Sequence, residues 1–438
     1  MGKNASLTKN LILVFFCFSI TFSCLQNVLE IDDSDGVLGE TNAPVSFKIK
    51  LNQNQKIAAE EGRLGLLNIT SDNGKERLIP VQMDIPGKGG KSQLVMIMPE
   101  GEAGIRKFKL MESESILNEA MKAYLDPGSG QVVISEDDEK VLQYNYNTVY
   151  EEDVIRLEYE KLERHLRTET DTFVTASIYA VPRSNYIHPL YGLEGEMLTR
   201  DWPEGDHPHH RGIYWAWPEV EYGSEFGDLH ALQVIFSRPT GELKYLNGPV
   251  FAQVKAENFW MWEDTEPILQ EHVVIRAYKV SSSSRIIDLT LKFVALKEGI
   301  TIATRGKKSY GGLNLRMQFP ESQEISYFTQ DNSMAIRAWS DLSGTFEGAK
   351  SPSGLMVLQH QDNPDYPGDW IEYPDLAWVQ PTFPAQGTRY PLGKEEPLIL
   401  RYRLVIHTGG KPEEYISKKR WDAFHETLTP LYTFPATY

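Results

Sequence analysis

Residues 287–293 read Ile-Asp-Leu-Thr-Leu-Lys-Phe, a strict alternation of apolar and polar side chains. Successive side chains of a β-strand point to opposite faces of a sheet, so this stretch predicts a strand with one buried and one hydrated face. Residues 400–406 alternate in part in the same way, and residues 250–257 and 272–280 add two further candidate strands. No helical pattern separates these stretches, which favours an antiparallel sandwich over an α/β fold. The four serines at 281–284 predict a hairpin loop.

Shorter alternations occur upstream, separated by clusters of Asn, Gly, Asp and Pro. They lie at residues 45–51, 65–69, 94–98 and 105–110. This pattern predicts a small N-terminal β domain over residues 43–140, ahead of a large sandwich over residues 145–438. Residues 113–124 place apolar side chains at helical spacing and predict one amphipathic helix near the junction.

The C-terminal part predicts a second helix. Residues 411–428 open with Pro412 at a helix start, and Trp421, Phe424 and Leu428 fall on one face. We expect this helix to pack on the sandwich.

The first 24 residues predict a lipoprotein signal peptide. Lys3 and Lys9 form a basic start, and residues 11–22 are almost entirely apolar. This run is shorter than the roughly 20 residues that span a bilayer, and it ends in a small residue followed by Cys24. Cys24 is therefore the predicted lipidation site, with a plain secretory signal as the alternative. The acidic residues 25–42 predict a flexible tether.

The composition excludes several classes of site. The chain has 438 residues, 41% of them hydrophobic, which is enough for a large core. Of its two cysteines, Cys17 lies in the predicted signal, so disulfides, thiol nucleophiles and thiolate metal sites are excluded from the processed chain. The net charge of −17 argues against nucleic-acid binding. We expect an exported protein attached to a bacterial membrane only through its lipid anchor, with the periplasmic face favoured.

The stretch 198–217 carries most of the candidate chemistry. His207, His209, His210 and Arg211 fall within five residues, in a loop that prolines and glycines restrain. Imidazoles next to a guanidinium suit acid–base catalysis, recognition of a carboxylate, or metal binding. A structural loop with no chemical role is equally compatible with the spacing. A metal site would need a third ligand, and the candidates are His188, His230 and His360.

Several segments together resemble the PmoA-like domain family, which carries the label "methane oxygenase PmoA". The matching pieces are 206–212 (Asp-His-Pro-His-His-Arg-Gly), 186–190 (Tyr-Ile-His-Pro-Leu), 310–313 (Tyr-Gly-Gly-Leu) with Arg316, 354–355 (Gly-Leu) leading to His360, Asn363-Pro364, and Trp370. The resemblance covers residues 146–410. A membrane oxygenase subunit would need several spanning helices, and no stretch after the predicted signal is long and apolar enough, so we exclude that activity.

The resemblance implies an exported bacterial protein of poorly defined function that is associated with carbohydrate use. It also implies a large β-sandwich similar to the galactose mutarotase superfamily, with a concave sugar-binding face. No late glutamate is evident as a base, so sugar epimerisation is not favoured.

We therefore expect a carbohydrate hydrolase or lyase in which His209 or His210 exchanges the proton and Arg211 and Arg316 bind an oxygen-rich group. A non-catalytic carbohydrate-binding lipoprotein and a structural module are the alternatives, and a divalent metal cofactor is not favoured. The expected substrate-binding residues are His188, Tyr214, Trp215, Trp217, Arg316, His360, Asn363 and Trp370.

Overall fold

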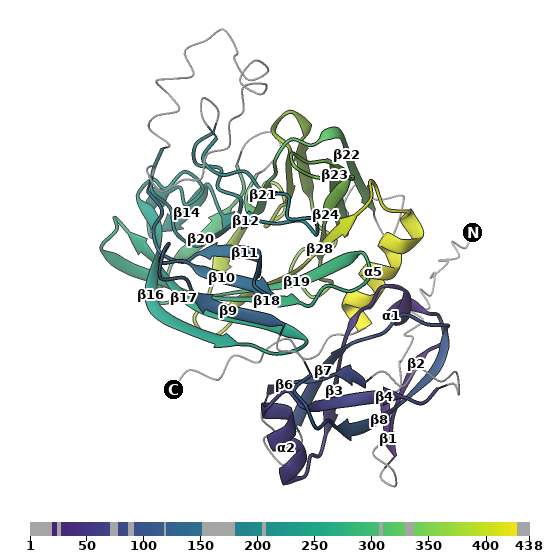
Figure 1. The fold of residues 1–438 in the computed structure, drawn as a ribbon. Helices are drawn as coiled ribbons and strands as arrows, with labels where there is room; N and C mark the ends of the chain where they lie inside the picture. Colours follow the sequence, from purple (N-terminus) through teal and green to yellow (C-terminus); the bar gives the residue numbers. More distant parts are fainter. Residues whose placement is uncertain are drawn as a thin grey trace, which may run out of the picture.

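The computed structural model describes residues 20–23, 28–70, 78–85, 92–117, 120–150, 180–203, 207–305, 310–328 and 337–426. These residues form an almost all-β protein with two eight-stranded antiparallel sheets, a smaller N-terminal β region and a C-terminal helix (Figure 1). The predicted all-β sandwich is confirmed. No helix in the described part of the chain is long and apolar enough to cross a membrane.

The first eight-stranded sheet, here called the site sheet, has the strand order β25-β26-β21-β13-β12-β11-β10-β9. Its strands are β9 (Met121–Leu125), β10 (Val132–Glu136), β11 (Glu139–Asn145), β12 (Tyr186–Leu190), β13 (Ile213–Ala216), β21 (Gly312–Arg316), β25 (Trp370–Tyr373) and β26 (Trp378–Pro381).

The second eight-stranded sheet, here called the long sheet, has the order β16-β17-β18-β19-β28-β24-β23-β22. Its strands are β16 (Ile235–Leu246), β17 (Phe251–Trp262), β18 (Glu266–Tyr278), β19 (Ser284–Ala295), β22 (Glu321–Phe328), β23 (Trp339–Thr345), β24 (Ser353–Gln359) and β28 (Leu398–Thr408). A four-stranded sheet completes this part, with β14 (Glu219–Tyr222), β15 (Glu225–Gly227), β20 (Ile300–Ala303) and β27 (Arg389–Leu392).

The N-terminal β region contains a five-stranded and a three-stranded antiparallel sheet and two short helices. Its elements are β1 (Ile20–Ser23), β2 (Val28–Asp33), α1 (Val37–Glu40), β3 (Pro44–Ile49), α2 (Gln53–Glu60), β4 (Leu64–Asn68), β5 (Leu78–Pro80), β6 (Gln82–Ile85), β7 (Ser92–Ile97) and β8 (Gly104–Glu112).

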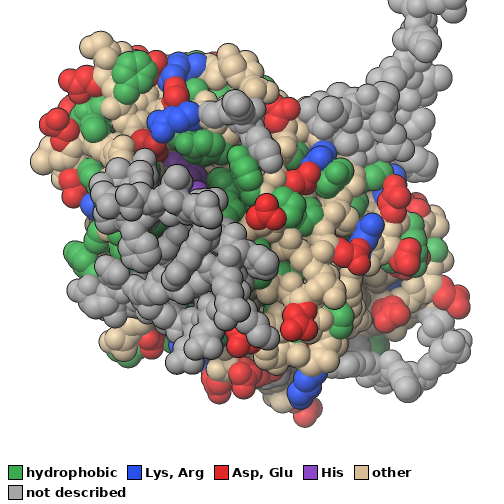
Figure 2. Space-filling view, turned by 90° about the horizontal axis from the view of Figure 1, so that it is seen from above, with side chains coloured by type: hydrophobic (Ala, Val, Ile, Leu, Met, Phe, Trp, Pro, Cys, Tyr) green, Lys and Arg blue, Asp and Glu red, His purple; other side chains and the backbone are tan. Residues whose placement is uncertain are grey.

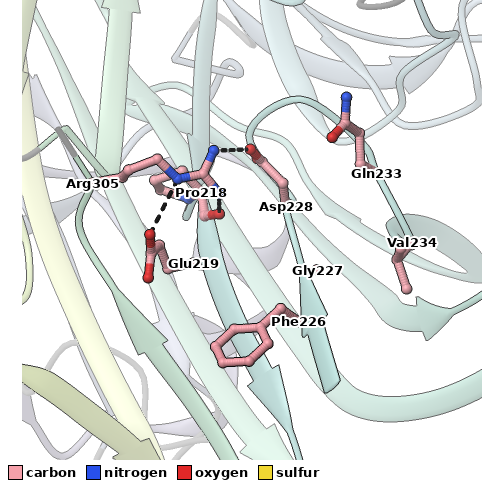
Figure 3. A pocket seen from close by; sticks show the side chains of 8 residues that line it. All are labelled: Pro218, Glu219, Phe226, Gly227, Asp228, Gln233, Val234 and Arg305. Atoms are coloured by element: carbon pink, nitrogen blue, oxygen red, sulfur yellow. Dashed lines mark hydrogen bonds and ion pairs between the residues drawn. The ribbon is translucent and has the colours of Figure 1, made fainter. Parts of the chain in front are cut away.

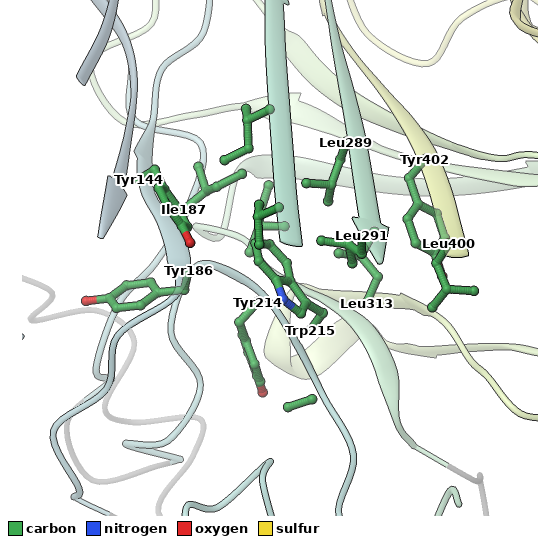
Figure 4. Close-up of a cluster of buried hydrophobic side chains, with 14 of the residues drawn as sticks. Tyr144, Tyr186, Ile187, Tyr214, Trp215, Leu289, Leu291, Leu313, Leu400 and Tyr402 are labelled. Carbon is green, nitrogen blue, oxygen red and sulfur yellow. The ribbon is translucent and has the colours of Figure 1, made fainter. Parts of the chain in front are cut away.

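The main core lies between the two large sheets. Trp215 of the site sheet packs among Leu289 and Leu291 of the long sheet. Tyr186 and Tyr214 belong to the same buried cluster, but their side chains point away from those leucines (Figure 4). The period of two along a strand explains this arrangement, because Trp215 and its neighbour Tyr214 must face opposite sides. The side of the site sheet that carries Tyr214 is called the outer face below.

The predicted strands around residues 250–295 and 400–406 are confirmed as β17, β18, β19 and β28, and the serine loop joins β18 to β19. The prediction of a hydrated face at 287–293 is only partly right, because Asp288 and Thr290 are buried. Asp288 forms an ion pair with Arg403 at 2.7 Å, and the Arg403 guanidinium lies over the ring of Phe424. Phe424 belongs to α5 (Glu414–Glu426), the predicted C-terminal helix, which covers this second face.

Two predictions near the junction are wrong. Residues 121–125 form β9 rather than the second half of a helix, because Met121 and Ala123 are buried at a period of two and pair with β10. Since β9, β10 and β11 all belong to the site sheet, the boundary at residue 140 is corrected and the sandwich begins at β9.

The predicted tether over residues 25–42 is also corrected. Residues 28–33 form β2, paired along its length with β8, and Leu29 and Ile31 are fully buried. The hydrophobic alternation within this acidic segment is what allows a strand to form. Cys24 lies outside the described residues. The edge strand β1, which falls in the predicted signal, pairs only with β2, so the remaining sheet does not depend on it.

Candidate functional site

The outer face of the site sheet carries a row of buried polar side chains. Tyr186 of β12 pairs with Tyr214 of β13, and Tyr214 pairs with Asn314 of β21. Gln380 of β26 extends the row, since its Nε2 donates to Asn314 Oδ1 at 2.6 Å. In each strand the named residue alternates with neighbours that point to the other face of the sheet. All four side chains are 0% exposed. A buried polar row of this kind needs partners, and the nearby loops supply them.

The loop 207–211 covers this face. The rings of His209 and His210 lie edge to face with centroids 4.6 Å apart, and His207 stacks on His210 at 4.7 Å. His207 is exposed, His209 is partly buried and His210 is 2% exposed, so the histidines lead from the surface into the protein. Figure 2 shows histidine side chains in a hollow next to hydrophobic side chains.

Gly212 fixes where this loop joins β13. Its φ is +58°, and a Cβ at this position would lie 2.8 Å from the Cβ of His188 and closer still to the Ile187 carbonyl oxygen. Glycine is therefore needed for both conformation and space. The Gly212 N–H donates to the Arg200 carbonyl at 2.8 Å, and the Arg316 N–H donates to the Gly212 carbonyl at 2.9 Å.

A fourth histidine, His230, reaches the same place from the loop 228–234. Its Nε2 lies 3.0 Å from the Tyr214 hydroxyl and 3.2 Å from Asn314 Oδ1. Arg183 holds the loop by donating to the carbonyls of Leu229 and His230. We call His207, His209, His210 and His230 the histidine cluster. One ligand nitrogen from each of His209, His210 and His230 lies within 4.8 Å of the others.

Asp228 organises the His230 loop from its start. One carboxylate oxygen of Asp228 accepts from the Ala231 N–H at 2.7 Å, and the other accepts from Arg305 Nη1 at 2.8 Å. Its backbone also exchanges two hydrogen bonds of 2.8 Å with Gln233. His230 thus sits in a loop closed by side-chain and backbone bonds.

The buried imidazoles are held neutral. Burial, together with the positive charge of Arg183, lowers the pKa of His230 to about 3. Burial likewise lowers the pKa of His210 well below its ordinary value, with neighbouring imidazoles and Arg316 acting in the same direction. At neutral pH both rings can accept a hydrogen bond or bind a metal through a nitrogen lone pair.

Aromatic rings line one side of the histidine cluster. Trp378 lies 4.6 Å from the His210 ring and 5.1 Å from Tyr373, and Tyr310 lies 5.1 Å from the His230 ring, all between centroids. Flat apolar surfaces next to hydrogen-bonding groups suit a ligand with both apolar and polar edges.

Arg211 has a different place from the one predicted. Its guanidinium forms a buried ion pair with Asp201, donates to the Tyr186 hydroxyl at 2.6 Å and stacks on the Trp202 ring at 4.3 Å. Burial alone would raise the pKa of Asp201, but Arg211 outweighs it and the pKa is lowered. His188 lies beside this pair, bonded to Thr199 at 3.0 Å, rather than in the histidine cluster. We therefore reassign Arg211 from catalysis to structure.

Trp215 and Trp217 are corrected as well, because both lie in the core. Trp215 Nε1 donates to Glu271 of the long sheet, and Trp217 Nε1 donates to the Phe383 carbonyl at 2.6 Å. Neither ring is available for stacking on a ligand.

Three further predicted residues lie outside the cluster. The His360 ring stacks on His425 of α5 at 4.8 Å, on the far face of the long sheet. Asn363 bonds to both the backbone N–H and the carbonyl of Arg401, and Trp370 Nε1 donates to the Arg337 carbonyl at 2.8 Å. These contacts stabilise turns and strand ends, so the substrate-binding interpretation is not supported for them.

Of the predicted residues, His207, His209, His210, Tyr214 and Arg316 are brought together, and His230 is the proposed third metal ligand that joins them. The sequence reasoning missed Asn314, Trp378 and Gln380 as site residues. The sequence holds a weak indication of them in the spacing of two along a strand. Asn314 lies two positions before Arg316, and Trp378 lies two positions before Gln380. The residues of each pair therefore share a strand face.

A separate pocket of about 350 Å³ lies behind the His230 loop (Figure 3). Arg305 crosses it, contacting Glu219 at 3.2 Å, Asp228 at 2.8 Å and the Pro218 carbonyl. The exposed ring of Phe226 and the side chain of Val234 form its apolar rim. Its charged groups pair with one another, so it supports the loop rather than offering an open charge to a ligand.

No curated protein matches the chain. A family model described as "Family of unknown function (DUF6807)" matches residues 131–420, which run from β10 into α5 and include the whole histidine cluster. This match covers more than half of the chain, and the protein therefore belongs to that family, the Family of unknown function (DUF6807).

Proposed function

We propose that the chain is a carbohydrate-processing protein whose ligand binds against the histidine cluster on the outer face of the site sheet. The observation that carries the proposal is the convergence of four imidazoles with Tyr214, Asn314 and Trp378 in a hollow that is polar at its base and aromatic at its side. Sugars present hydroxyl groups at their edges and apolar C–H faces, so they match this combination. The resemblance to the PmoA-like domain family supports the same assignment.

Proton abstraction fits the described residues better than hydrolysis by two carboxylates. Most glycosidases need a pair of carboxyl groups across the scissile bond. The carboxylates of Asp201 and Asp228, in the segments that flank the cluster, are already paired with Arg211 and Arg305. Imidazole and phenol groups of the site, such as those of His209 and Tyr310, are of the kinds that act as general acids and bases.

We infer an elimination on a sugar that carries a carboxyl group. A base removes the proton next to the carboxyl group, the electron pair forms a C=C bond, and the C–O bond at the β position breaks. The leaving oxygen then receives a proton. The positive charges of Arg183 and Arg316 near the cluster favour the anionic sugar and the charge that develops on its carboxyl group.

The test is a screen of neutral and uronate-containing oligosaccharides by thermal shift, followed by an absorbance assay for the new double bond. We expect a uronate-specific shift and an ultraviolet-absorbing product. In His209→Ala turnover should be lost while binding stays within about tenfold, because the base acts mainly in the transition state. His272→Ala, a change at a partly buried histidine of β18, is the matched control and should retain both.

Other results would contradict this proposal at different points. New reducing ends without absorbance would mean hydrolysis, and binding without turnover would mean a non-catalytic carbohydrate-binding protein. If no sugar changes the melting temperature, the carbohydrate assignment fails.

We also propose export and lipid attachment at Cys24, with the protein on the periplasmic face of a bacterial membrane. The support is the basic start, the short apolar run and the small residue before Cys24. Metabolic labelling with a radioactive fatty acid tests this proposal. The label should appear in the natural chain and be absent from Cys24→Ala, and equal labelling of both would overturn it.

A further inference from the structure

We propose that His209, His210 and His230 bind one divalent transition-metal ion of the zinc class. The site is argued from the geometry of the three imidazoles and their neighbours and not from the carbohydrate assignment. It shares His209 with the proposed function: a metal bound to His209 would occupy the lone pair that abstracts a proton, so with the metal in place the base would be another group such as Tyr310. They come from two loops, with His210 and His230 separated by 20 positions in the sequence, and the fold brings one nitrogen of each within 4.8 Å of the others.

The spacing is close to that of a metal site. Zinc–nitrogen bonds of about 2.0–2.1 Å place the nitrogens of a tetrahedral site roughly 3.4 Å apart. The three nitrogens would therefore have to approach one another by up to about 1.4 Å, the difference between 4.8 and 3.4 Å. His209 is partly exposed and lies in a loop, so it can make this movement, while His210 and His230 are 2% exposed and held in place.

His230 has the second contact that metal-binding histidines usually show. Its Nε2 lies 3.2 Å from Asn314 Oδ1, an oxygen that also accepts from Gln380 Nε2. An amide oxygen only accepts, so the Asn314 contact is a hydrogen bond in the tautomer that carries its proton on Nε2, which also has the Tyr214 hydroxyl at 3.0 Å. In that tautomer the Nδ1 lone pair is left for a metal, and the Asn314 oxygen favours it.

His210 supplies a second indication. Its Nδ1 atom is buried and has no hydrogen-bond partner among the described residues. A buried polar atom without a partner costs free energy, so such atoms usually mark an interaction with something else. A metal bound by the cluster would account for it.

The ligand chemistry selects the class of metal. Three imidazoles without thiolates suit zinc, cobalt, nickel or copper, whereas calcium and magnesium prefer oxygen ligands. Three protein ligands also leave a coordination position for a water or substrate oxygen. The nearby charges of Arg183 and Arg316 oppose a dication, so we expect an anion to accompany the metal and to tighten its binding.

The experiment uses the purified chain, stripped with a chelator and dialysed. Zinc is titrated by calorimetry, and cobalt is added as a visible absorption probe, with and without acetate as the anion. We expect one metal per chain, a cobalt d–d band, and tighter zinc binding with acetate. His209→Ala and His230→Ala should each weaken zinc binding at least tenfold, and His272→Ala should not.

Circular dichroism on each variant shows that the chain is folded, and His209→Ala is the safer variant because His209 is partly exposed. A folded natural chain that binds neither zinc nor cobalt would overturn the proposal, as would unchanged binding in the folded His209→Ala variant. Because metal binding is measured without any sugar, a negative result here leaves the carbohydrate proposal standing, and a positive result moves the proton-abstracting role from His209 to another group such as Tyr310.

Discussion

At the scale of single residues, the Arg211–Asp201 pair shows how burial gives two charged side chains a structural role. Arg211 is 0% exposed and Asp201 accepts from both its Nε and its Nη2. The Tyr186 hydroxyl completes the arrangement by contacting both partners. Removing one member of a buried pair leaves the other charged and unpaired, which is far more costly than breaking an exposed pair.

We expect Arg211→Met to destabilise the protein by about 3–5 kcal/mol, because the Asp201 carboxylate stays buried without its cation. The measurement is chemical unfolding at neutral pH. Asp264→Asn is the control, since it breaks an exposed ion pair with Arg238 and should cost less than about 1 kcal/mol. An Arg211→Met variant as stable as the natural chain would show that the pair contributes nothing to folding.

At the scale of elements, the His230 loop carries backbone strain. Leu232 and Val234 have φ values of +57° and +71°, in the left-handed region that L-residues avoid at a cost of about 1–2 kcal/mol. Strain of this kind persists where the surroundings impose it, and it gathers at functional sites. The bonds from Asp228, Arg305 and Arg183 provide that constraint here.

Val234→Asn should therefore stabilise the protein by about 1 kcal/mol, because Asn tolerates the left-handed region and Val234 is already 40% exposed. Thermal unfolding measures the change. Ile105→Asn is the matched control, an exposed β-branched residue in strand β8 without a positive φ, and it should give no stabilisation. A destabilised Val234→Asn would mean that the valine side chain contributes more than its backbone strain costs.

The C-terminal helix α5 carries a pH-sensitive contact. His360 and His425 stack at 4.8 Å beneath the helix, and burial is the main cause that lowers the pKa of each to about 3. Arg403 lowers both values further, while the Trp421 carbonyl raises that of His425. In the unfolded chain both would titrate near 6.5.

The sign of the effect follows from these values. Below about pH 6.5 the two histidines bind protons in the unfolded chain but not in the folded chain. The free energy of unfolding therefore decreases as the pH is lowered from about 6.5 to about 3. Each histidine contributes a slope of up to about 1.4 kcal/mol per pH unit. We expect His425→Gln to lose less stability than the natural chain between pH 7.5 and pH 5 in urea unfolding. Equal losses in both chains would contradict a role for this pair.

At the scale of the whole molecule, the N-terminal β region docks on the sandwich through a few buried polar contacts. Gln82 Oε1 accepts from the N–H groups of Val250 and Phe251 at 3.0 and 2.9 Å. Asp84 forms a buried ion pair with Arg276 at 2.6 Å, and Glu40 pairs with Lys419 of α5 at 2.6 Å. Ala423 of α5 also packs into the N-terminal core, so the helix joins the two parts (Figure 1).

Gln82→Ala should weaken this docking, because two buried N–H groups lose their acceptor at a cost of about 1–3 kcal/mol each. Differential scanning calorimetry should then show a broadened or divided transition in place of a single one. Gln93→Ala removes a glutamine that bonds to Ser46 within the N-terminal region, and it should keep a single transition. A single sharp transition in Gln82→Ala would show that other contacts suffice.

The sequence alone was enough to predict the strand-rich class, the C-terminal helix and the concentration of histidines in the loop 207–211. These depend on local properties: the period of two in β19, the helical spacing of Trp421 and Phe424, and the density of imidazoles in the loop. The local pattern was misleading at residues 113–124. Its helical spacing predicted a helix, but residues 121–125 form β9, which pairs with β10.

Only the tertiary structure decided which side chains of residues 207–217 face the histidine cluster and which face the core. Trp215 and Tyr214 are neighbours in sequence, but the sheet sends one to the core and the other to the histidine cluster. His230, Asn314 and Gln380 meet there through strand register and loop closure. The contacts that join them link residues 84 and 66 positions apart, so they leave no local pattern in the sequence. The direction of a side chain in a sheet depends on the pairing of its strand with distant strands. The sequence could therefore predict which loop is rich in candidate residues, but not which side chains from other strands lie next to it.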